Sequence, residues 1–128
     1  KNFALSNNRK FCRIELIDHQ KTEKLSAQSI YSKSLAKHPL KSHENHMSGS
    51  AGYFPTEDME TICFMIPELG IIIDAGSGLF RAKKYIQTDT LHIFLTHCHS
   101  DHTCGLAYLN AFSKNTNLKI YIHASQFT

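Results

Sequence analysis

A short stretch rich in histidine constrains this chain more than any other part of its sequence. It follows an apolar, strand-like run at residues 91–95 and precedes a helix-like run at residues 105–112. Its candidate metal ligands follow the pattern His-x-His-x-Asp-His, and they are His97, His99, Asp101 and His102. Imidazole and carboxylate groups are the ligands that borderline divalent metals prefer, and zinc is the leading candidate. The sequence therefore predicts a metal site at a strand-to-helix junction.

The spacing of these ligands predicts that they divide between two metals. In an extended segment, residues two apart project to the same side, so His97 and His99 can bind one metal while Cys98 points away. Asp101 and His102 come where the chain turns into the helix, and they can reach a second metal close by. Crowded imidazoles repel one another when they protonate, so a purely structural role for this cluster is disfavoured. Two neighbouring metals that share a hydroxide are a known hydrolytic device.

The segments around the motif alternate between strand-like and helix-like patterns. Residues 61–66 and 71–73 predict a β-hairpin, since a four-residue turn beginning with Pro67 separates them. The three isoleucines at 71–73 indicate a strand covered on both faces of its sheet. Further along the chain we expect a short helix, a buried strand, a helix that packs on the sheet, and a core strand, at residues 79–86, 91–95, 105–112 and 118–123. This order is typical of an α/β layered sheet.

A carboxylate, Asp74, stands directly after the isoleucine strand and is followed by two glycines, Gly76 and Gly78. Asp74 can accept hydrogen bonds that orient the metal-binding loop. It can equally form an Asx-turn or cap the segment that follows. These residues alone leave both interpretations open. A dinucleotide-binding fingerprint would need a third glycine where the chain has Arg81, so that kind of site is not expected.

The charge distribution divides the chain into two parts. Residues 1–47 carry nine Lys and Arg against four Asp and Glu, whereas residues 48–128 carry five against seven. We expect a basic, poorly defined N-terminal segment over 1–47 and a partial domain over 48–128. We expect the basic residues of this segment to form a solvated surface rather than to bind a polyanion. Residues 41–50 are polar and predict a linker with two surface histidines, His43 and His46.

Composition indicates an ordinary globular chain of 128 residues, with 41% apolar residues. No apolar run is long enough to span a membrane, and the first residues lack the apolar core of a signal peptide. The four cysteines form no C-x-x-C pair, which favours free thiols in a reducing compartment, the cytoplasm; they are Cys12, Cys63, Cys98 and Cys104. A monomer and a homodimer are both compatible with the sequence.

Two segments of the chain resemble the metallo-β-lactamase superfamily. Thr96-His-Cys-His-Ser-Asp-His102 matches its hallmark, a strand followed by H-x-H-x-D-H. Ile72-Ile-Asp-Ala-Gly-Ser-Gly78 is similar to the segment that these proteins carry upstream, which favours the orienting role for Asp74. The resemblance covers roughly residues 48–123. It implies an α/β fold, the N-terminal half of an αββα metallo-β-lactamase-type sandwich with a mixed sheet.

The resemblance also implies a function, that of a metal-dependent hydrolase with two Zn²⁺ per complete site, Mn²⁺ or Fe²⁺ being alternatives. His97 and His99 would bind the first metal and Asp101 and His102 the second, with Asp101 also orienting the bridging hydroxide. The residues from Asp74 to Gly78 and from His102 to Leu106 are closest in wording to the branch that contains ribonuclease Z and cyclic-phosphate phosphodiesterases. The expected substrate is therefore a phosphodiester, either RNA processed at its 3′ end or a small molecule. A thioester or lactam hydrolase of the same superfamily is the alternative.

The ligands that superfamily members carry later in their chains do not occur in these 128 residues. Such proteins complete the site with a later histidine, a bridging aspartate and a final histidine, whereas here no Asp or Glu follows Asp101. The one later histidine, His123, lies in an apparent strand, and like His92 it is expected to be packed or hydrogen-bonded. One interpretation is an N-terminal fragment of a two-metal hydrolase. The other is a truncated, non-catalytic relative that binds metal weakly or not at all.

Overall fold

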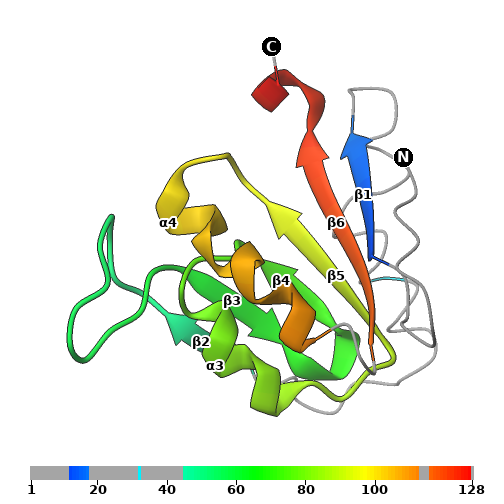
Figure 1. Ribbon diagram of the computed structural model, residues 1–128. Helices are drawn as coiled ribbons and strands as arrows, with labels where there is room; N and C mark the ends of the chain where they lie inside the picture. Colours follow the sequence, from blue (N-terminus) through cyan, green and yellow to red (C-terminus); the bar gives the residue numbers. More distant parts are fainter. Residues whose placement is uncertain (1–11, 18–31, 33–44, 113–115, 128) are drawn as a thin grey trace.

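A mixed six-stranded sheet forms the body of the molecule in this computed structural model, which describes residues 12–17, 32, 45–112 and 116–127 (Figure 1). The strand order is β1-β6-β5-β4-β3-β2. The strands are β1 (Cys12–Ile17), β2 (His46–Gly49), β3 (Cys63–Ile66), β4 (Ile71–Ile73), β5 (Thr90–Leu95) and β6 (Asn117–His123). The helical segments are η1 (Pro67–Leu69), α3 (Leu79–Ala82), η2 (Lys83–Tyr85), α4 (Ser100–Thr103), η3 (Cys104–Ala111) and η4 (Ala124–Phe127), where η denotes a 3-10 helix.

Strands β4, β5, β6 and β1 run parallel, while β3 and β2 complete the sheet in antiparallel pairs. The predicted hairpin is confirmed, because Ile66 pairs with Ile71 across a four-residue connection. Gly70 closes this turn in the left-handed region at φ 63°, and its N–H donates to the Pro67 carbonyl. A side chain at Gly70 would be strained there. The sheet and its few helices confirm the expected α/β fold.

One face of the sheet carries the core and is covered by α3, α4 and η3 (Figure 1). Alternate residues of β5 and β6 point into this layer and are at most 9% exposed; they are Leu91, Ile93, Leu95, Leu118, Ile120 and Ile122. The predicted packing of the segment after the motif is confirmed, since Leu106, Leu109 and Phe112 contact this core. Ile71 and Ile72 project to opposite faces and are both buried, as the run of isoleucines predicts.

One part of the chain differs from expectation. The predicted linker is wrong for residues 46–49, which form strand β2 and pair with β3. A close backbone contact explains the difference, because a Cβ at Gly49 would lie within van der Waals overlap of the Thr61 carbonyl. His46 contacts Tyr85, with the two rings tilted and their centroids 3.6 Å apart. His43 lies outside the described residues.

The basic N-terminal segment contributes a strand to the same sheet. Its residues 12–17 form β1, which adds in parallel to β6 at the edge of the sheet. A strand in this segment and the domain over 48–128 therefore share one sheet. Among the described helices, none is long and apolar enough to cross a membrane.

Candidate metal centre

The histidine motif lies where β5 ends and helix α4 begins. Strand β5 ends at Leu95, and α4 starts at Ser100 with His99 as its extended N-cap residue. Asp101 occupies the first helical turn, where the positive end of the peptide dipoles favours a carboxylate. The helical segment therefore begins five residues earlier than the pattern at 105–112 predicted. As a result, Asp101 and His102 are held on regular backbone.

Asp74 reaches this loop from the neighbouring strand. The ends of the parallel strands β4 and β5 meet, and the Asp74 N–H donates to the Phe94 carbonyl at 2.8 Å. Asp74 is 4% exposed and adopts a φ of 58°, a region in which Asp and Asn are enriched among non-glycine residues. Its carboxylate accepts the Thr96 N–H at 2.9 Å and the Thr96 hydroxyl at 2.9 Å. Its side chain thus ties the end of β5 to the end of β4.

The same carboxylate fixes one ring of the motif. Asp74 Oδ2 lies 2.9 Å from His102 Nδ1. With the Nδ1 proton donated to Asp74, the other ring nitrogen carries a lone pair. That nitrogen, Nε2, lies 3.3 Å from Asp101 Oδ2. The lone pairs of His102 Nε2 and Asp101 Oδ2 repel each other unless a proton or a metal ion binds to them. This geometry therefore suits a metal ion.

Thr96 was missed as a site residue in the sequence. Its Oγ1 lies 3.0 Å from His97 Nδ1 while it also contacts Asp74. A hydroxyl that donates to the carboxylate can accept the Nδ1 proton of His97, which leaves the Nε2 atom of that ring free. A hydroxyl residue between a strand and a predicted ligand is the signal that could have identified it.

The three motif rings lie close together, and that of His102 also lies beside Asp101. Ring centroids of His97 and His99 are 4.6 Å apart, and those of His97 and His102 are 4.0 Å apart. Asp101 Oδ1 is buried and has no hydrogen-bond partner. An unpaired buried acceptor costs about 1–3 kcal/mol, which a bound cation would offset. The donor types and this orphaned oxygen fit a divalent metal.

The donors do not close around one point. Within the described part of the chain, no group of three or more His, Cys, Asp or Glu side chains is arranged to hold one ion. The ring of His97 lies close to the rings of both His99 and His102, and His102 in turn lies beside Asp101. The division of these ligands between two metals therefore stays a prediction.

Close backbone contacts join the loop after Asp74 to the helical segment that carries the motif. The Ala75 N–H donates to the His102 carbonyl at 2.7 Å, and the Gly105 N–H donates to the Ala75 carbonyl at 2.8 Å. A Cβ at Gly105 would lie 2.1 Å from the Gly76 carbonyl oxygen, and one at Gly76 would lie 2.3 Å from the Asp101 carbonyl oxygen. Only glycine permits this approach, so the Asp74 loop and the motif helix are fixed relative to each other.

The two other histidines near the motif are hydrogen-bonded, as expected. His92 Nδ1 lies 2.8 Å from the Tyr121 hydroxyl, and the two rings are stacked. Burial lowers the pKa of His92, the nearby Lys119 lowers it further, and Glu15 opposes them. At the end of β6, His123 Nδ1 lies 2.7 Å from the Ser125 hydroxyl.

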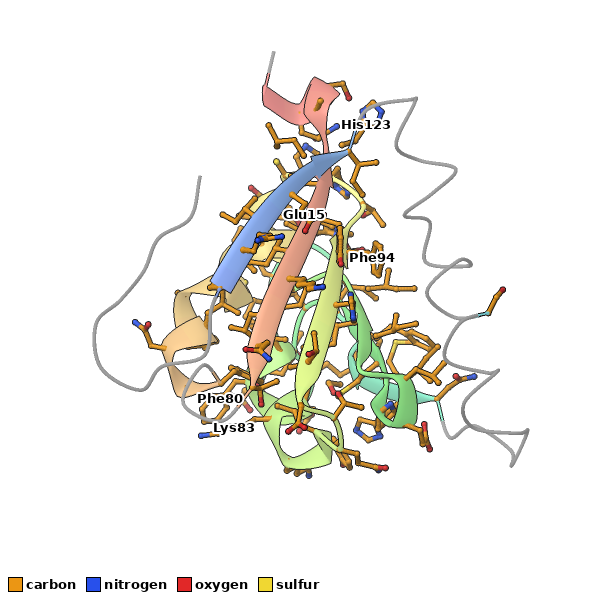
Figure 2. All side chains as sticks on the ribbon, turned by 90° about the vertical axis from the view of Figure 1, so that its right-hand side faces the viewer. Glu15, Phe80, Lys83, Phe94 and His123 are labelled. Atoms are coloured by element: carbon orange, nitrogen blue, oxygen red, sulfur yellow. The ribbon has the colours of Figure 1, made fainter. Side chains whose placement is uncertain are left out.

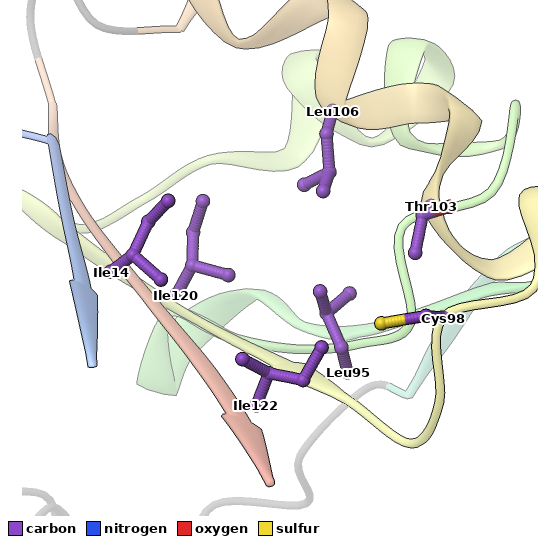
Figure 3. Close-up of a pocket in the computed structure, with 7 residues that line it drawn as sticks. All are labelled: Ile14, Leu95, Cys98, Thr103, Leu106, Ile120 and Ile122. Carbon is purple, nitrogen blue, oxygen red and sulfur yellow. The ribbon is translucent and has the colours of Figure 1, made fainter. Parts of the chain in front are cut away.

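The cysteines near the centre have surroundings outside the candidate ligand set. Cys98 is exposed, and its side chain lines an open apolar pocket of about 250 Å³ together with Leu95, Leu106 and other residues (Figure 3). Cys104 Sγ contacts Thr61 Oγ1 at 3.8 Å. Burial, followed by the charge of Asp74, raises the pKa of Cys63 to about 12, so this thiol stays protonated.

Comparison with known proteins agrees with this arrangement. Residues 63–127, just over half of the chain, match the family model described as the Metallo-beta-lactamase superfamily. Ribonuclease Z from Nanoarchaeum equitans (strain Kin4-M) is 33% identical over 66 residues, which cover 48% of this chain and 21% of that protein. The match therefore spans about a fifth of the length of this relative. No solved structure matches the chain. By its family match, its motif and its mixed sheet, the chain belongs to the metallo-β-lactamase superfamily.

Proposed function

We propose that this chain supplies the first half of a dinuclear zinc centre in a hydrolase that cleaves phosphodiester bonds. The observation that carries the proposal is the buried, unpaired Asp101 Oδ1 beside His102, whose Nδ1 is fixed by Asp74. Three imidazoles and one carboxylate are a borderline ligand set, which favours Zn²⁺ over Mn²⁺ and Fe²⁺.

In the proposed centre, His97 and His99 hold one ion, and Asp101 and His102 hold the other. When bound, the ions supply Lewis acidity and bring the pKa of a water molecule towards neutrality. Asp74 and Thr96 position the rings of His102 and His97 by occupying their Nδ1 atoms. Asp101 would bind through the oxygen that now lacks a partner and orient the nucleophile towards the substrate.

The proposed substrate class rests on the name of the relative. The name Ribonuclease Z denotes an enzyme that acts on RNA, and the histidine motif lies within the residues that match the family model. A phosphodiester in RNA is therefore favoured over a small cyclic phosphate, and both over a lactam or thioester. Since the match spans about a fifth of that protein, activity and substrate are proposals for this chain.

Hydrolysis of bis-p-nitrophenyl phosphate tests the proposal. We expect the zinc-loaded chain, together with the downstream part of its reading frame where there is one, to release p-nitrophenol. Asp101→Asn keeps the shape of the side chain and should lower the rate at least 100-fold. A rate that this substitution leaves unchanged, or the absence of any turnover with zinc bound, would contradict a phosphodiesterase.

A second candidate function is a metal-binding relative without catalysis. One observation favours it: within the described residues, no three candidate donors are arranged to hold one ion. This candidate predicts that the 128-residue chain binds zinc and leaves bis-p-nitrophenyl phosphate intact.

A further inference from the structure

A cluster of cations lies on α3 and η2, outside the metal centre. Residues 48–128 contain five Lys and Arg, and three of them fall within four positions, namely Arg81, Lys83 and Lys84. All three side chains are exposed. No Asp or Glu occurs between Asp74 and Asp89, although residues 48–128 carry a net charge of −2. The positive charge of this part of the chain is therefore concentrated on one short surface.

Two aromatic side chains stand exposed on the same helical layer. Phe80 on α3 is 60% exposed, and Tyr108 on η3 is 43% exposed. Their rings meet edge to face, with centroids 5.7 Å apart. Phe80 and the three cations line one open hollow of about 480 Å³, and Figure 2 shows Phe80 and Lys83 side by side. We call Phe80, Arg81, Lys83, Lys84 and Tyr108 the α3 surface.

The cations differ in how they are already engaged. Arg81 Nε contacts Glu60 Oε1 at 3.2 Å, so part of its charge is neutralised. Lys84 Nζ lies 4.9 Å above the Tyr85 ring, a contact that leaves its charge in place. Within the described residues, neither Lys83 nor Lys84 has a carboxylate partner. Two ammonium groups beside an exposed aromatic pair are thus available to an anionic ligand.

We propose that the α3 surface binds single-stranded RNA, with Phe80 and Tyr108 stacking on bases and Lys83 and Lys84 contacting phosphates. Every base has a π face, so aromatic side chains beside cations bind single strands with little sequence preference. This proposal rests on the proposed phosphodiester substrate and names where its RNA is held.

The position of the surface fits that role. Helix α3 begins directly after the Asp74 loop, and η3 continues the helix that carries Asp101 and His102. The two helical segments also pack against each other at Phe80 and Tyr108. An RNA strand bound to the α3 surface therefore lies along α3 and η3, the two helical segments that lead to the metal centre.

Fluorescence anisotropy with a labelled 12-nucleotide single-stranded RNA tests the proposal, using the 128-residue chain with its metal and a gel to exclude cleavage. Replacing both Lys83 and Lys84 by alanine should weaken binding about tenfold at low salt. It should also lower the slope of log Kd against log salt concentration by about 1.4, because two phosphate contacts are lost. Phe80→Ala should weaken binding about fivefold or more and leave the slope unchanged. Tyr108→Ala provides a second stacking variant.

Matched controls lie elsewhere on the molecule. Phe54→Ala removes a side chain that is 73% exposed on another loop, and Lys119→Ala removes a cation from the sheet. Both should change Kd less than twofold. Equal losses in the controls, wild-type binding by the α3 variants, or variant-sensitive binding to phosphatidylserine vesicles with none to RNA would overturn the proposal.

The same variants separate this proposal from the hydrolytic one. Bis-p-nitrophenyl phosphate needs no extended surface, so the α3 variants should hydrolyse it at the wild-type rate. Variant-sensitive RNA binding without any hydrolysis would leave the α3 surface standing and remove the proposed reaction. Hydrolysis combined with RNA binding that the α3 variants do not change would support the proposed reaction and remove the α3 surface as the RNA-binding site.

Discussion

His92 and His102 lie ten positions apart, one within strand β5 and one on the helix after it, and their surroundings differ in kind. The Nδ1 of His92 contacts the neutral phenol of Tyr121, while burial, followed by the charge of Lys119, lowers the pKa of the ring. The Nδ1 of His102 contacts the buried carboxylate of Asp74, and its Nε2 faces the carboxylate of Asp101.

The difference shows how partners divide structural from functional histidines. A phenol partner and a nearby ammonium suit a neutral imidazole that packs in the sheet. A carboxylate on one ring nitrogen and an unsatisfied acceptor opposite the other suit a cation between the side chains. The following four predictions test this contrast, from the largest expected effect to the smallest.

Gly105→Ala should have the largest effect on stability. Its Cβ would overlap the Gly76 carbonyl oxygen, where the loop after Asp74 packs against the helix that carries His102. We expect the free energy of unfolding to fall by about 3 kcal/mol, measured by urea denaturation. Gly52→Ala is the matched control, since a Cβ there meets nothing within 4 Å. Equal stability of the two variants would show that the Asp74 loop does not pack as described.

Asp74→Ala removes the acceptor of the Thr96 N–H, the Thr96 hydroxyl and His102 Nδ1. We expect zinc affinity to fall about 10–100-fold, and stability to fall by about 2 kcal/mol because buried donors lose their partner. Competition with a chromophoric chelator measures the affinity. His92→Gln is the matched control and should bind zinc like the wild type. A loss in both variants would erase the distinction between the two histidines.

Thr96→Val keeps the shape of the side chain and removes the hydroxyl that joins Asp74 to His97. We expect zinc affinity to fall about tenfold, at the lower end of the effects of such supporting contacts. Thr96→Ser should restore most of the affinity in the same competition assay. If valine and serine behave alike, the hydroxyl does not position the ring.

The smallest effect is the pH dependence that His92 contributes. Its pKa is lowered in the folded state, so the unfolded chain binds more protons as the pH falls below about 6.5. The stability that comes from a neutral His92 is therefore present above that pH and is lost as the pH falls towards the lowered pKa. Between pH 7 and pH 5, His92→Gln should lose a few tenths of a kcal/mol less stability than the wild type, by urea denaturation at each pH. A greater loss of stability in His92→Gln than in the wild type would contradict a lowered pKa for His92.

The sequence predicted those features whose cause is local. Hydrophobic alternation gave the core strand at 91–95, and the turn after Ile66 gave the hairpin. The meeting of Asp74 with the motif was also foreseeable, because parallel strands end at one edge of a sheet. The histidine spacing alone separated the candidate ligands from His92.

Features that depend on distant contacts were not predicted. Strand β2 is only four residues long and has no clear apolar pattern; it forms because it pairs with β3 and because Gly49 fits against Thr61. Strand β1 joins the sheet through a partner more than 100 residues away. The role of Thr96 required knowledge of where Asp74 places its carboxylate.

Zinc content after dialysis tests the central claim most directly. The chain is compared with Cys98→Ser/Cys104→Ser, which removes its exposed thiols, and with Asp101→Asn/His102→Gln in that same background. The account predicts that zinc is retained without the thiols and is lost when Asp101 and His102 are changed. Zinc that disappears with the cysteines, or that persists without Asp101 and His102, would contradict it.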